Sequence, residues 1–209
     1  ADAESYRAQI AYLLERSAFY REKLGPSPSD RLEEIAGLPL SEKSELRATV
    51  TSDNPFGAHL CAERSEIVRI YSTSGTTGAP SYIPLTAEDV ENWLVGSSRS
   101  YAASGVAPGQ RIVSTYNAGP FVAGAALAAF ERIGLVHIPV GTGNSALLVR
   151  AIETLEPDAV VMTPSYAAHL AESHDLRDSS VQRVLVAGEP GGGEPAFRAK
   201  LEEGWGAKV

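Results

Sequence analysis

The sequence has little sulfur, little positive charge and no long apolar run. Its 209 residues include one cysteine, Cys61, which excludes an internal disulfide framework and suits a reducing compartment. Eighteen Lys and Arg against 26 Asp and Glu leave a net charge of −8, which argues against a nucleic-acid or anionic-membrane surface. No apolar run approaches the ~20 residues of a membrane helix, and no signal peptide opens the chain. We therefore expect a cytoplasmic protein that binds neither nucleic acid nor membrane.

Common catalytic patterns are also absent. There is no Gly-x-Ser-x-Gly elbow, which argues against a serine hydrolase. His169 and His174 do not share a helical face, and no Cys or carboxylate completes a ligand set with them, so we expect no metal site. Cys61 is interpreted as an ordinary half-buried thiol.

The first 65 residues read as a helical lead-in. Helical spacing of apolar residues from Tyr6 to Leu24 predicts one long amphipathic helix, which a Gly-Pro-Ser-Pro stretch at residues 25–28 ends. Short helices are expected at Arg31–Ala36 and Glu42–Ala48. We expect residues 1–65 to pack on a core formed by residues 66–209.

From residue 66 the pattern alternates between strand and helix. Short continuous apolar runs separated by helical segments predict an α/β fold, a doubly wound and mostly parallel sheet with flanking helices. Ligands in such sheets lie beyond the carboxyl ends of the strands. Strands are expected at Ile67–Ser72, Arg111–Thr115, Val136–Val140, Ala159–Met162 and Val184–Ala187, and helices at about Ala87–Ala103, Gly119–Ile133, Ser145–Leu155, Ser165–Ser173 and Glu194–Glu203.

The most informative segment is Ser72–Pro80, which follows the first of these strands. Its glycines allow a tight backbone turn, and its hydroxyls add hydrogen-bond donors, so it predicts a polyphosphate cradle. The residues of this cradle are Ser74, Gly75, Thr76, Thr77 and Gly78. It is not a P-loop of the Walker type, because no Lys follows within the loop and Pro80 prevents an immediate helix. A flexible surface loop is the simpler alternative.

Ser72–Pro80 resembles the signature loop of the acyl-adenylate-forming superfamily, which includes acyl-CoA synthetases, adenylation domains and luciferases. The segments Leu13–Arg21, Leu38–Lys43 and Asn54–Gly57 are similar to the N-terminal part of its phenylacetate-CoA ligase group. Thr163–Leu170 and Ala187–Gly192 also look like segments of that group, in the same order. Most of the superfamily has Lys after the loop proline. The small hydroxylic residue here, Ser81, is common in the phenylacetate-CoA ligase group.

The resemblance implies that a carboxylate and ATP give an acyl-adenylate and pyrophosphate, followed by attack of the coenzyme A thiol. ATP, Mg2+ and coenzyme A are the expected cofactors and co-substrates, and an aromatic carboxylic acid is the expected substrate. The family's magnesium-binding Glu, ribose-binding Asp and catalytic Lys have no counterpart in this sequence. The chain therefore looks like the N-terminal part of such an enzyme, without catalytic residues of its own and inactive alone.

The resemblance also implies two further binding elements. Gly188, Glu189 and Pro190 would form a shelf for the adenine; a plain turn before a helix is the alternative. The acid would lie against a wall that begins where the strand Arg111–Thr115 ends and that Tyr166 closes. The aromatic rings of this wall would stack on the acid, and its small residues would leave room for the acid. For each aromatic residue, packing in the core is an equal alternative. The residues of this wall are Tyr116, Asn117, Ala118, Gly119 and Phe121.

Other functions remain open on sequence alone. One is a nucleotide- or acyl-adenylate-binding module without turnover, and another is an adenylating enzyme that loads a carrier protein. An uncovered sheet edge in a half-domain favours self-association, so a homodimer is among the assemblies that the sequence allows.

Overall fold

The computed structural model describes residues 2–73, 81–116 and 123–209. The chain divides into two compact units, with the boundary between Glu88 and Asp89. The sequence places its change of pattern at residue 65, and that division into domains stays a prediction.

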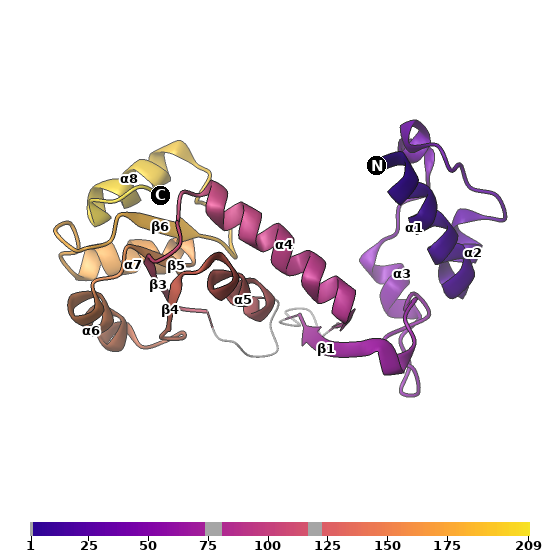
Figure 1. The fold of residues 1–209 in the computed structure, drawn as a ribbon, viewed down its shortest axis with the longest axis horizontal. Coiled ribbons are helices and arrows are strands. Elements are labelled where there is room, and N and C mark those ends of the chain that lie inside the picture. The colour runs from indigo at the N-terminus through magenta and orange to yellow at the C-terminus, as the bar shows by residue number, and fades with distance from the viewer. Residues whose placement is uncertain (1, 74–80, 117–122) are drawn as a thin grey trace. The chain divides into compact units, whose positions relative to one another are not determined.

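The first unit consists of short helices followed by two strands (Figure 1). Its elements are α1 (Asp2–Arg16), α2 (Ala18–Leu24), η1 (Leu32–Gly37), α3 (Lys43–Ala48), η2 (Arg64–Glu66), β1 (Ile67–Ser72) and β2 (Tyr82–Thr86). The prediction of one long N-terminal helix was wrong, because the helix is interrupted at Ser17. This residue has extended backbone angles, φ −123° and ψ 122°, and its Oγ accepts from the Tyr20 N–H at 3.3 Å. The same hydroxyl donates to the Ala58 carbonyl at 2.8 Å, and Ser17 is only 1% exposed.

β1 does not belong to the parallel sheet in which the sequence placed it. It pairs antiparallel with β2 in a separate two-stranded sheet, with Tyr71 opposite Ile83. At the open end of this pair, the Thr73 N–H donates to the Ser81 carbonyl at 3.0 Å. The strand was located correctly, but its partner is β2, the segment that follows the signature loop in the sequence.

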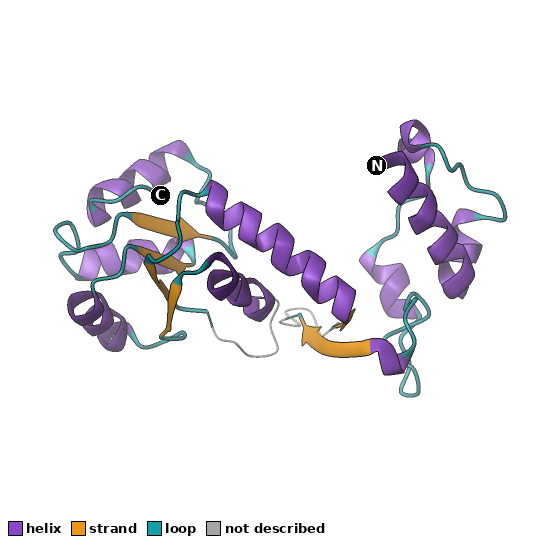
Figure 2. Ribbon diagram, viewed as in Figure 1, coloured by secondary structure: helices purple, strands orange, loops and turns teal. Residues whose placement is uncertain are grey.

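The second unit is the predicted α/β sheet with flanking helices (Figure 2). Its four strands are parallel and lie in the order β4-β3-β5-β6, with Val113 level with Ile138 and Val160. The elements are α4 (Ala87–Ala103), β3 (Arg111–Ser114), α5 (Ala123–Ile133), β4 (Val136–Pro139), α6 (Ser145–Leu155), β5 (Ala159–Met162), α7 (Pro164–Ser173), β6 (Arg183–Val186) and α8 (Pro195–Trp205).

Alternate residues of the strands face two separate apolar layers, as a doubly wound sheet requires. On β5, Val160 and Met162 pack with Leu148 of α6, Leu170 of α7 and Trp205 of α8. Ala159 and Val161 pack on the other face, whose layer also contains Leu127 and Phe130 of α5 and Tyr101 of α4. Every residue of β5 is buried, so helices cover the sheet on both sides. This confirms the predicted fold class.

Candidate functional site

The order of the strands creates a switch point between β3 and β5. From β3 the chain crosses to β4 on one side, then returns to β5 on the other side and continues to β6. In open parallel sheets the crevice beyond the carboxyl ends of the strands at such a point is the usual ligand site. Tyr116 follows β3, Thr163 follows β5 and Ala187 follows β6, so all three lie at this edge.

The Tyr116 side chain bridges the ends of neighbouring strands. Its phenol oxygen lies 2.8 Å from the Met162 carbonyl oxygen and 2.6 Å from that of Ala187. A phenol has one proton to donate, so the two carbonyls share it or receive it in turn. Burial, followed by the nearby Tyr101, raises the pKa of Tyr116 to about 12, so the phenol is neutral at physiological pH.

Gly188 brings the predicted adenine shelf against this tyrosine. Its φ of +100° is one that side-chain-bearing residues rarely adopt. A Cβ built on it would lie 3.5 Å from Thr163 Cγ2 and 3.9 Å from the Tyr116 hydroxyl. The structure therefore brings together Tyr116 and Gly188, residues that the sequence assigned to two different binding elements.

Glu189 is engaged by the start of helix α7. Its Oε1 accepts from the Ser165 backbone N–H at 2.6 Å. Hydrogen bonds from Ser165, then from Thr163, lower the pKa of Glu189 despite some desolvation. Helix α7 begins with Pro164, and Thr163 at its N-cap supplies no side-chain cap, so Glu189 accepts one of the helix's otherwise unpaired N–H groups.

Ser165 and Thr163 were not singled out as site residues from the sequence. The Thr-Pro pair at a helix start was the available signal, because the first N–H groups of a helix need an acceptor. The sequence does not show that this acceptor is Glu189, which lies 24 residues further along the chain.

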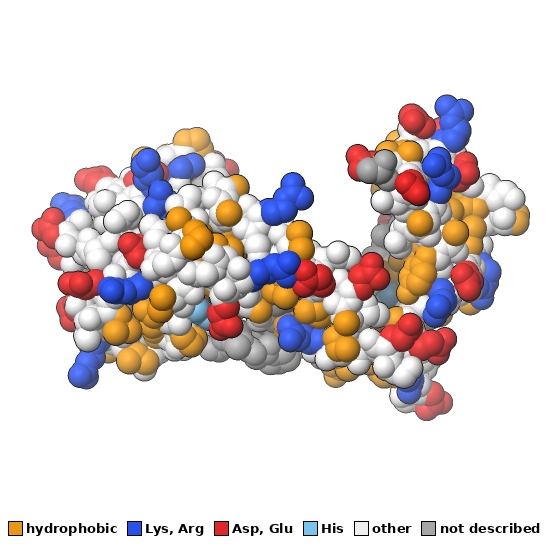
Figure 3. Space-filling view, viewed as in Figure 1, with side chains coloured by type: hydrophobic (Ala, Val, Ile, Leu, Met, Phe, Trp, Pro, Cys, Tyr) orange, Lys and Arg blue, Asp and Glu red, His pale blue; other side chains and the backbone are white. Residues whose placement is uncertain are grey.

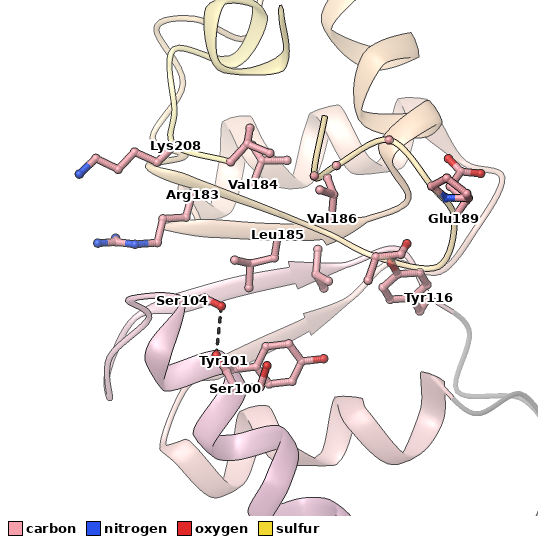
Figure 4. A pocket seen from close by; sticks show the side chains of 17 residues that line it. Ser100, Tyr101, Ser104, Tyr116, Arg183, Val184, Leu185, Val186, Glu189 and Lys208 are labelled. Atoms are coloured by element: carbon pink, nitrogen blue, oxygen red, sulfur yellow. Dashed lines mark hydrogen bonds between the residues drawn. The ribbon is translucent and has the colours of Figure 1, made fainter. Parts of the chain in front are cut away.

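A cavity of about 500 Å³ runs along β6 from this turn (Figure 4). Tyr116 and Glu189 lie at one end of it, and Arg183 and Lys208 lie at the other. Lys208 forms an isolated parallel bridge with Arg183, beside β6. The remaining lining residues come from α4 and the residue after it, from β5, from β6 and the turn that follows it, and from the C-terminal residue: Ser100, Tyr101, Ser104, Val161, Val184, Leu185, Val186, Ala187, Pro190, Gly191, Gly192, Gly193 and Val209.

The other predicted site residues lie elsewhere or outside the described residues. The Tyr166 hydroxyl lies 2.9 Å from Ser145 Oγ at the start of α6, and its ring stacks on His169 at 6.4 Å between centroids. Tyr166 does not line the cavity along β6. The signature-loop residues and part of the predicted acid wall lie outside the described residues: Ser74, Gly75, Thr76, Thr77, Gly78, Asn117, Ala118, Gly119 and Phe121.

The distribution of charged side chains and of potential metal ligands does not point to a metal site in the described residues. On the face shown in Figure 3, Lys and Arg side chains are interspersed with Asp and Glu on each unit. Within residues 2–73, 81–116 and 123–209, no group of three or more His, Cys, Asp or Glu is arranged to hold a metal ion. None of the helices in those ranges is long and apolar enough to cross a membrane.

Comparisons with known proteins agree along nearly the whole chain. The chain is 32% identical to a phenylacetate-coenzyme A ligase of Thermus thermophilus over 98% of its length, and 32% identical to one of Escherichia coli over 78%. It spans less than half of these relatives, 47% and 38% of their lengths. No protein-family model matches the chain.

Solved structures give the same result. A 2-hydroxyisobutyryl-CoA ligase in complex with 2-HIB-AMP and CoA is 31% identical, with a TM-score of 0.90 over 99% of this chain and 46% of that one. A long-chain-fatty-acid-CoA ligase of Archaeoglobus fulgidus shares the fold. It is 21% identical, with a TM-score of 0.52 over 73% of this chain and 32% of that one. The chain therefore belongs to the acyl-adenylate-forming superfamily, in its phenylacetate-CoA ligase-like group.

Proposed function

We propose that the protein activates a carboxylic acid with ATP and transfers the acyl group to coenzyme A. The observation that carries this proposal is the site at the switch point of the sheet. There Tyr116 joins the ends of β3, β5 and β6, and the Gly188 turn lies directly against it. Nucleotides bind at this place in open parallel sheets. The likeness to a CoA ligase in complex with 2-HIB-AMP and CoA supports the same function here.

In the proposed complex the adenine lies against Gly188, Glu189 and Pro190. The cavity beside this turn, about 500 Å³, falls within the range of about 300–1,000 Å³ of small-molecule sites. Gly188 is exposed and has no Cβ, so a flat ring can approach its peptide plane. Glu189 is held by the α7 N-terminus, so its role is to position the turn. The phosphates would meet the donors of residues 74–78.

The chemistry requires two anions to approach each other. A carboxylate oxygen attacks the α-phosphorus of ATP and pyrophosphate leaves; the CoA thiolate then attacks the acyl carbonyl and AMP leaves. Hydrogen-bond donors on the β- and γ-phosphates withdraw charge from the α-phosphorus and stabilise the departing pyrophosphate. Mg2+ would add positive charge to these phosphates when bound. The residues of this chain bind and orient the nucleotide and the acid.

We propose an aromatic acid as the substrate. The Tyr116 ring is fixed through its hydroxyl, so one of its faces can pack against an aryl ring at the end of β3. Asn117, Ala118, Gly119, Phe121 and Tyr166 complete the proposed wall. The name phenylacetate-coenzyme A ligase, carried by the curated relatives, supports this choice. A small hydroxy acid is the competing substrate class, because a 2-hydroxyisobutyryl-CoA ligase has the same fold at 31% identity.

The test is ATP-dependent thioester formation with phenylacetate, benzoate and 2-hydroxyisobutyrate, measured by mass spectrometry on a protein in which this chain is continued to the length of its relatives, because the 209 residues alone are expected to be inactive. We expect thioesters of the aromatic acids, and we expect Ala118→Phe to block them while leaving ATP binding intact. A preference for 2-hydroxyisobutyrate would contradict the aromatic assignment. Normal turnover of phenylacetate by Ala118→Phe would contradict the proposed wall.

Melting-temperature and pyrophosphate-exchange measurements on the same protein distinguish two other functions. If an acyl-adenylate mimic raises the melting temperature but no pyrophosphate exchange occurs, the chain is a binding module without turnover. If exchange occurs but CoA does not accept the acyl group, transfer to a carrier protein becomes the better hypothesis. If neither the mimic nor ATP shifts the melting temperature, nucleotide binding itself is refuted.

A further inference from the structure

Two basic residues lie side by side at one end of the cavity along β6. Lys208 forms an isolated parallel bridge with Arg183, the first residue of β6. The Lys208 N–H donates to the Gln182 carbonyl at 3.1 Å, and the Lys208 carbonyl accepts from the Val184 N–H at 2.8 Å. Residues in register on adjacent strands direct their side chains to the same face of a sheet, and both of these side chains line the cavity (Figure 4).

No carboxylate of the described residues neutralises this pair of cations. In the ranges 2–73, 81–116 and 123–209, neither the half-buried Arg183 guanidinium nor the exposed Lys208 ammonium forms a hydrogen bond or an ion pair. Glu202 accepts from the Val209 N–H at 3.2 Å and from Arg198 Nε at 3.3 Å. These two bonds lower the pKa of Glu202 first, and the charge of Lys208 lowers it least. Like charges that face each other across a sheet ladder repel, so the pair is left with uncompensated positive charge in a chain of net charge −8.

The Arg183 side chain is seated against the end of helix α4. A Cβ built on Gly105, two residues after this helix, would lie 2.8 Å from Arg183 Nε and 3.1 Å from Nη2. The glycine therefore leaves the space that the guanidinium occupies. The last turn of α4 contains no basic residue, so Arg183 brings positive charge to a helix end that carries about half a negative charge. Compensation of the helix dipole is the simpler role for Arg183, but it offsets only part of the two full charges present.

The cavity offers uncharged surface next to these cations. Glu189 supplies the only acidic side chain among its described lining residues, and it lies at the opposite end (Figure 4). Leu185 of β6 and the ring of Tyr101 of α4 lie between the two ends. A ligand in this part of the cavity would therefore meet positive charge at one end and apolar or aromatic groups along its length.

This combination fits a phosphate group attached to an uncharged body. A phosphate dianion matches the two cations in charge, and its oxygens accept charge-assisted hydrogen bonds, which are stronger than neutral ones. The planar guanidinium of Arg183 can donate two parallel bonds to one phosphate, and the Lys208 ammonium adds a point charge. An apolar or aromatic body would pack against Leu185 and the Tyr101 ring.

We propose that Arg183, assisted by Lys208, binds a phosphate group at the amino end of β6, and that the uncharged part of the ligand extends along this strand. Every residue that forms this site belongs to the second unit. The inference goes beyond the proposed function and does not depend on it, because the adenine is proposed to lie at the other end of the cavity, beside Gly188 and Glu189. Free phosphate and a phosphate ester offer the same anionic group, and the test separates them.

The test is calorimetric titration with inorganic phosphate, phenyl phosphate and ATP at fixed ionic strength, on the chain continued to the length of its relatives. We expect Arg183→Gln to bind phenyl phosphate at least about tenfold more weakly, the size of one lost charge-assisted bond. Lys208→Gln should bind it about two- to fivefold more weakly, because an exposed ammonium contributes less. Arg150→Gln is the control, since Arg150 is an exposed arginine of α6 that does not line the cavity and the change in net charge is identical.

The possible outcomes decide both the site and the kind of ligand. Tighter binding of phenyl phosphate than of inorganic phosphate supports a phosphate ester, whereas equal affinities would support free phosphate and contradict the part of the ligand along β6. Absence of binding by the unmodified protein, or an equal loss in Arg150→Gln, overturns the site. A loss of ATP affinity in Arg183→Gln as large as that of phenyl phosphate would also overturn it, because Arg183 would then belong to the nucleotide site.

A melting curve of each variant verifies that it is folded. Arg183→Lys keeps the charge but not the fork of donors, so it should bind phenyl phosphate with intermediate affinity. This variant also preserves the positive charge at the end of α4, so it tests the site even if Arg183→Gln does not fold. Affinity in Arg183→Lys equal to that of the unmodified protein would contradict a bidentate contact from Arg183.

Discussion

The Tyr116 hydroxyl lies 2.6 Å from the carbonyl oxygen of Ala187, a residue 71 positions further along the chain. This contact joins the end of β3 to the end of β6 across the intervening strand β5, whose last carbonyl, that of Met162, lies 2.8 Å from the same hydroxyl. One side chain thus bridges the ends of three strands at the edge where the nucleotide is proposed to bind, in addition to backbone bonds such as that from the Ala187 N–H to the Met162 carbonyl at 3.1 Å.

Removing this hydroxyl should loosen the edge without altering the packing of the ring. We expect Tyr116→Phe to lower the free energy of unfolding by about 1 kcal/mol, the usual contribution of one hydrogen bond. Urea denaturation followed by circular dichroism measures this difference. A stability equal to that of the unmodified protein would show that the contact contributes nothing to the fold.

The Tyr116 phenol should lose its proton at a higher pH than an ordinary tyrosine. Burial raises the pKa of Tyr116 from 10.0 to about 12, so the folded state binds this proton more tightly than the unfolded state. Its contribution to stability is therefore complete below pH 10 and is lost as the pH rises from 10 to 12. In a spectrophotometric titration of tyrosinate, we expect a step near pH 12 that is absent from Tyr116→Phe. If the two titration curves coincide, the phenol is not buried as described.

Glu189 should be ionised below the usual range of a glutamate. Its pKa is lowered from 4.5 by hydrogen bonds from Ser165 and Thr163, so its stabilising contribution is present above pH 4.5 and is lost as the pH falls through the lower folded value. The Ser165 amide proton, followed by NMR, should report this titration with a midpoint below 4.5.

A matched variant tests the assignment of that signal. In Glu189→Gln the titration of the Ser165 amide should disappear, and the amide should exchange faster with solvent because its acceptor is weaker. A Ser165 signal that titrates identically in both proteins would show that another carboxylate is responsible.

Gly206 ends helix α8 and should not tolerate a side chain. Its φ is +61°, and a Cβ there would collide with the carbonyl oxygen of Arg177. Gly109 is the control, with a φ of +84° but open space within 4 Å of the point that a Cβ would occupy. We expect Gly109→Ala to cost roughly 1–2 kcal/mol of unfolding free energy, from the backbone conformation alone. Gly206→Ala should cost at least about 1 kcal/mol more, from the collision. Equal losses would mean that the Arg177 backbone moves away freely.

The sequence-based predictions were accurate where the interactions that form an element are local, and they failed where an element depends on a contact distant in sequence. The sequence predicted the bounds of β5, Ala159–Met162, and of α6, Ser145–Leu155, because the apolar periodicity of each element is local. The Asn144 side chain also caps α6 locally, accepting from the Leu147 N–H at 3.0 Å. The break at Ser17 was missed because its hydroxyl donates to Ala58, 41 residues away, and no nearby residue announces that bond.

By itself, the sequence determined the fold class, the family and the identity of the segments that are proposed to meet a nucleotide. Strand and helix periods, turn glycines and short motifs are properties of neighbouring residues, so they can be read along the chain. Only the tertiary structure decided that β1 pairs with β2 and that the Tyr116 hydroxyl donates to the Ala187 carbonyl. The same holds for the hydrogen bond from the Ser165 N–H, at the start of α7, to the Glu189 carboxylate, and for the position of Arg47 beside Ser81. These contacts join residues far apart in sequence, and their geometry depends on how whole elements pack together.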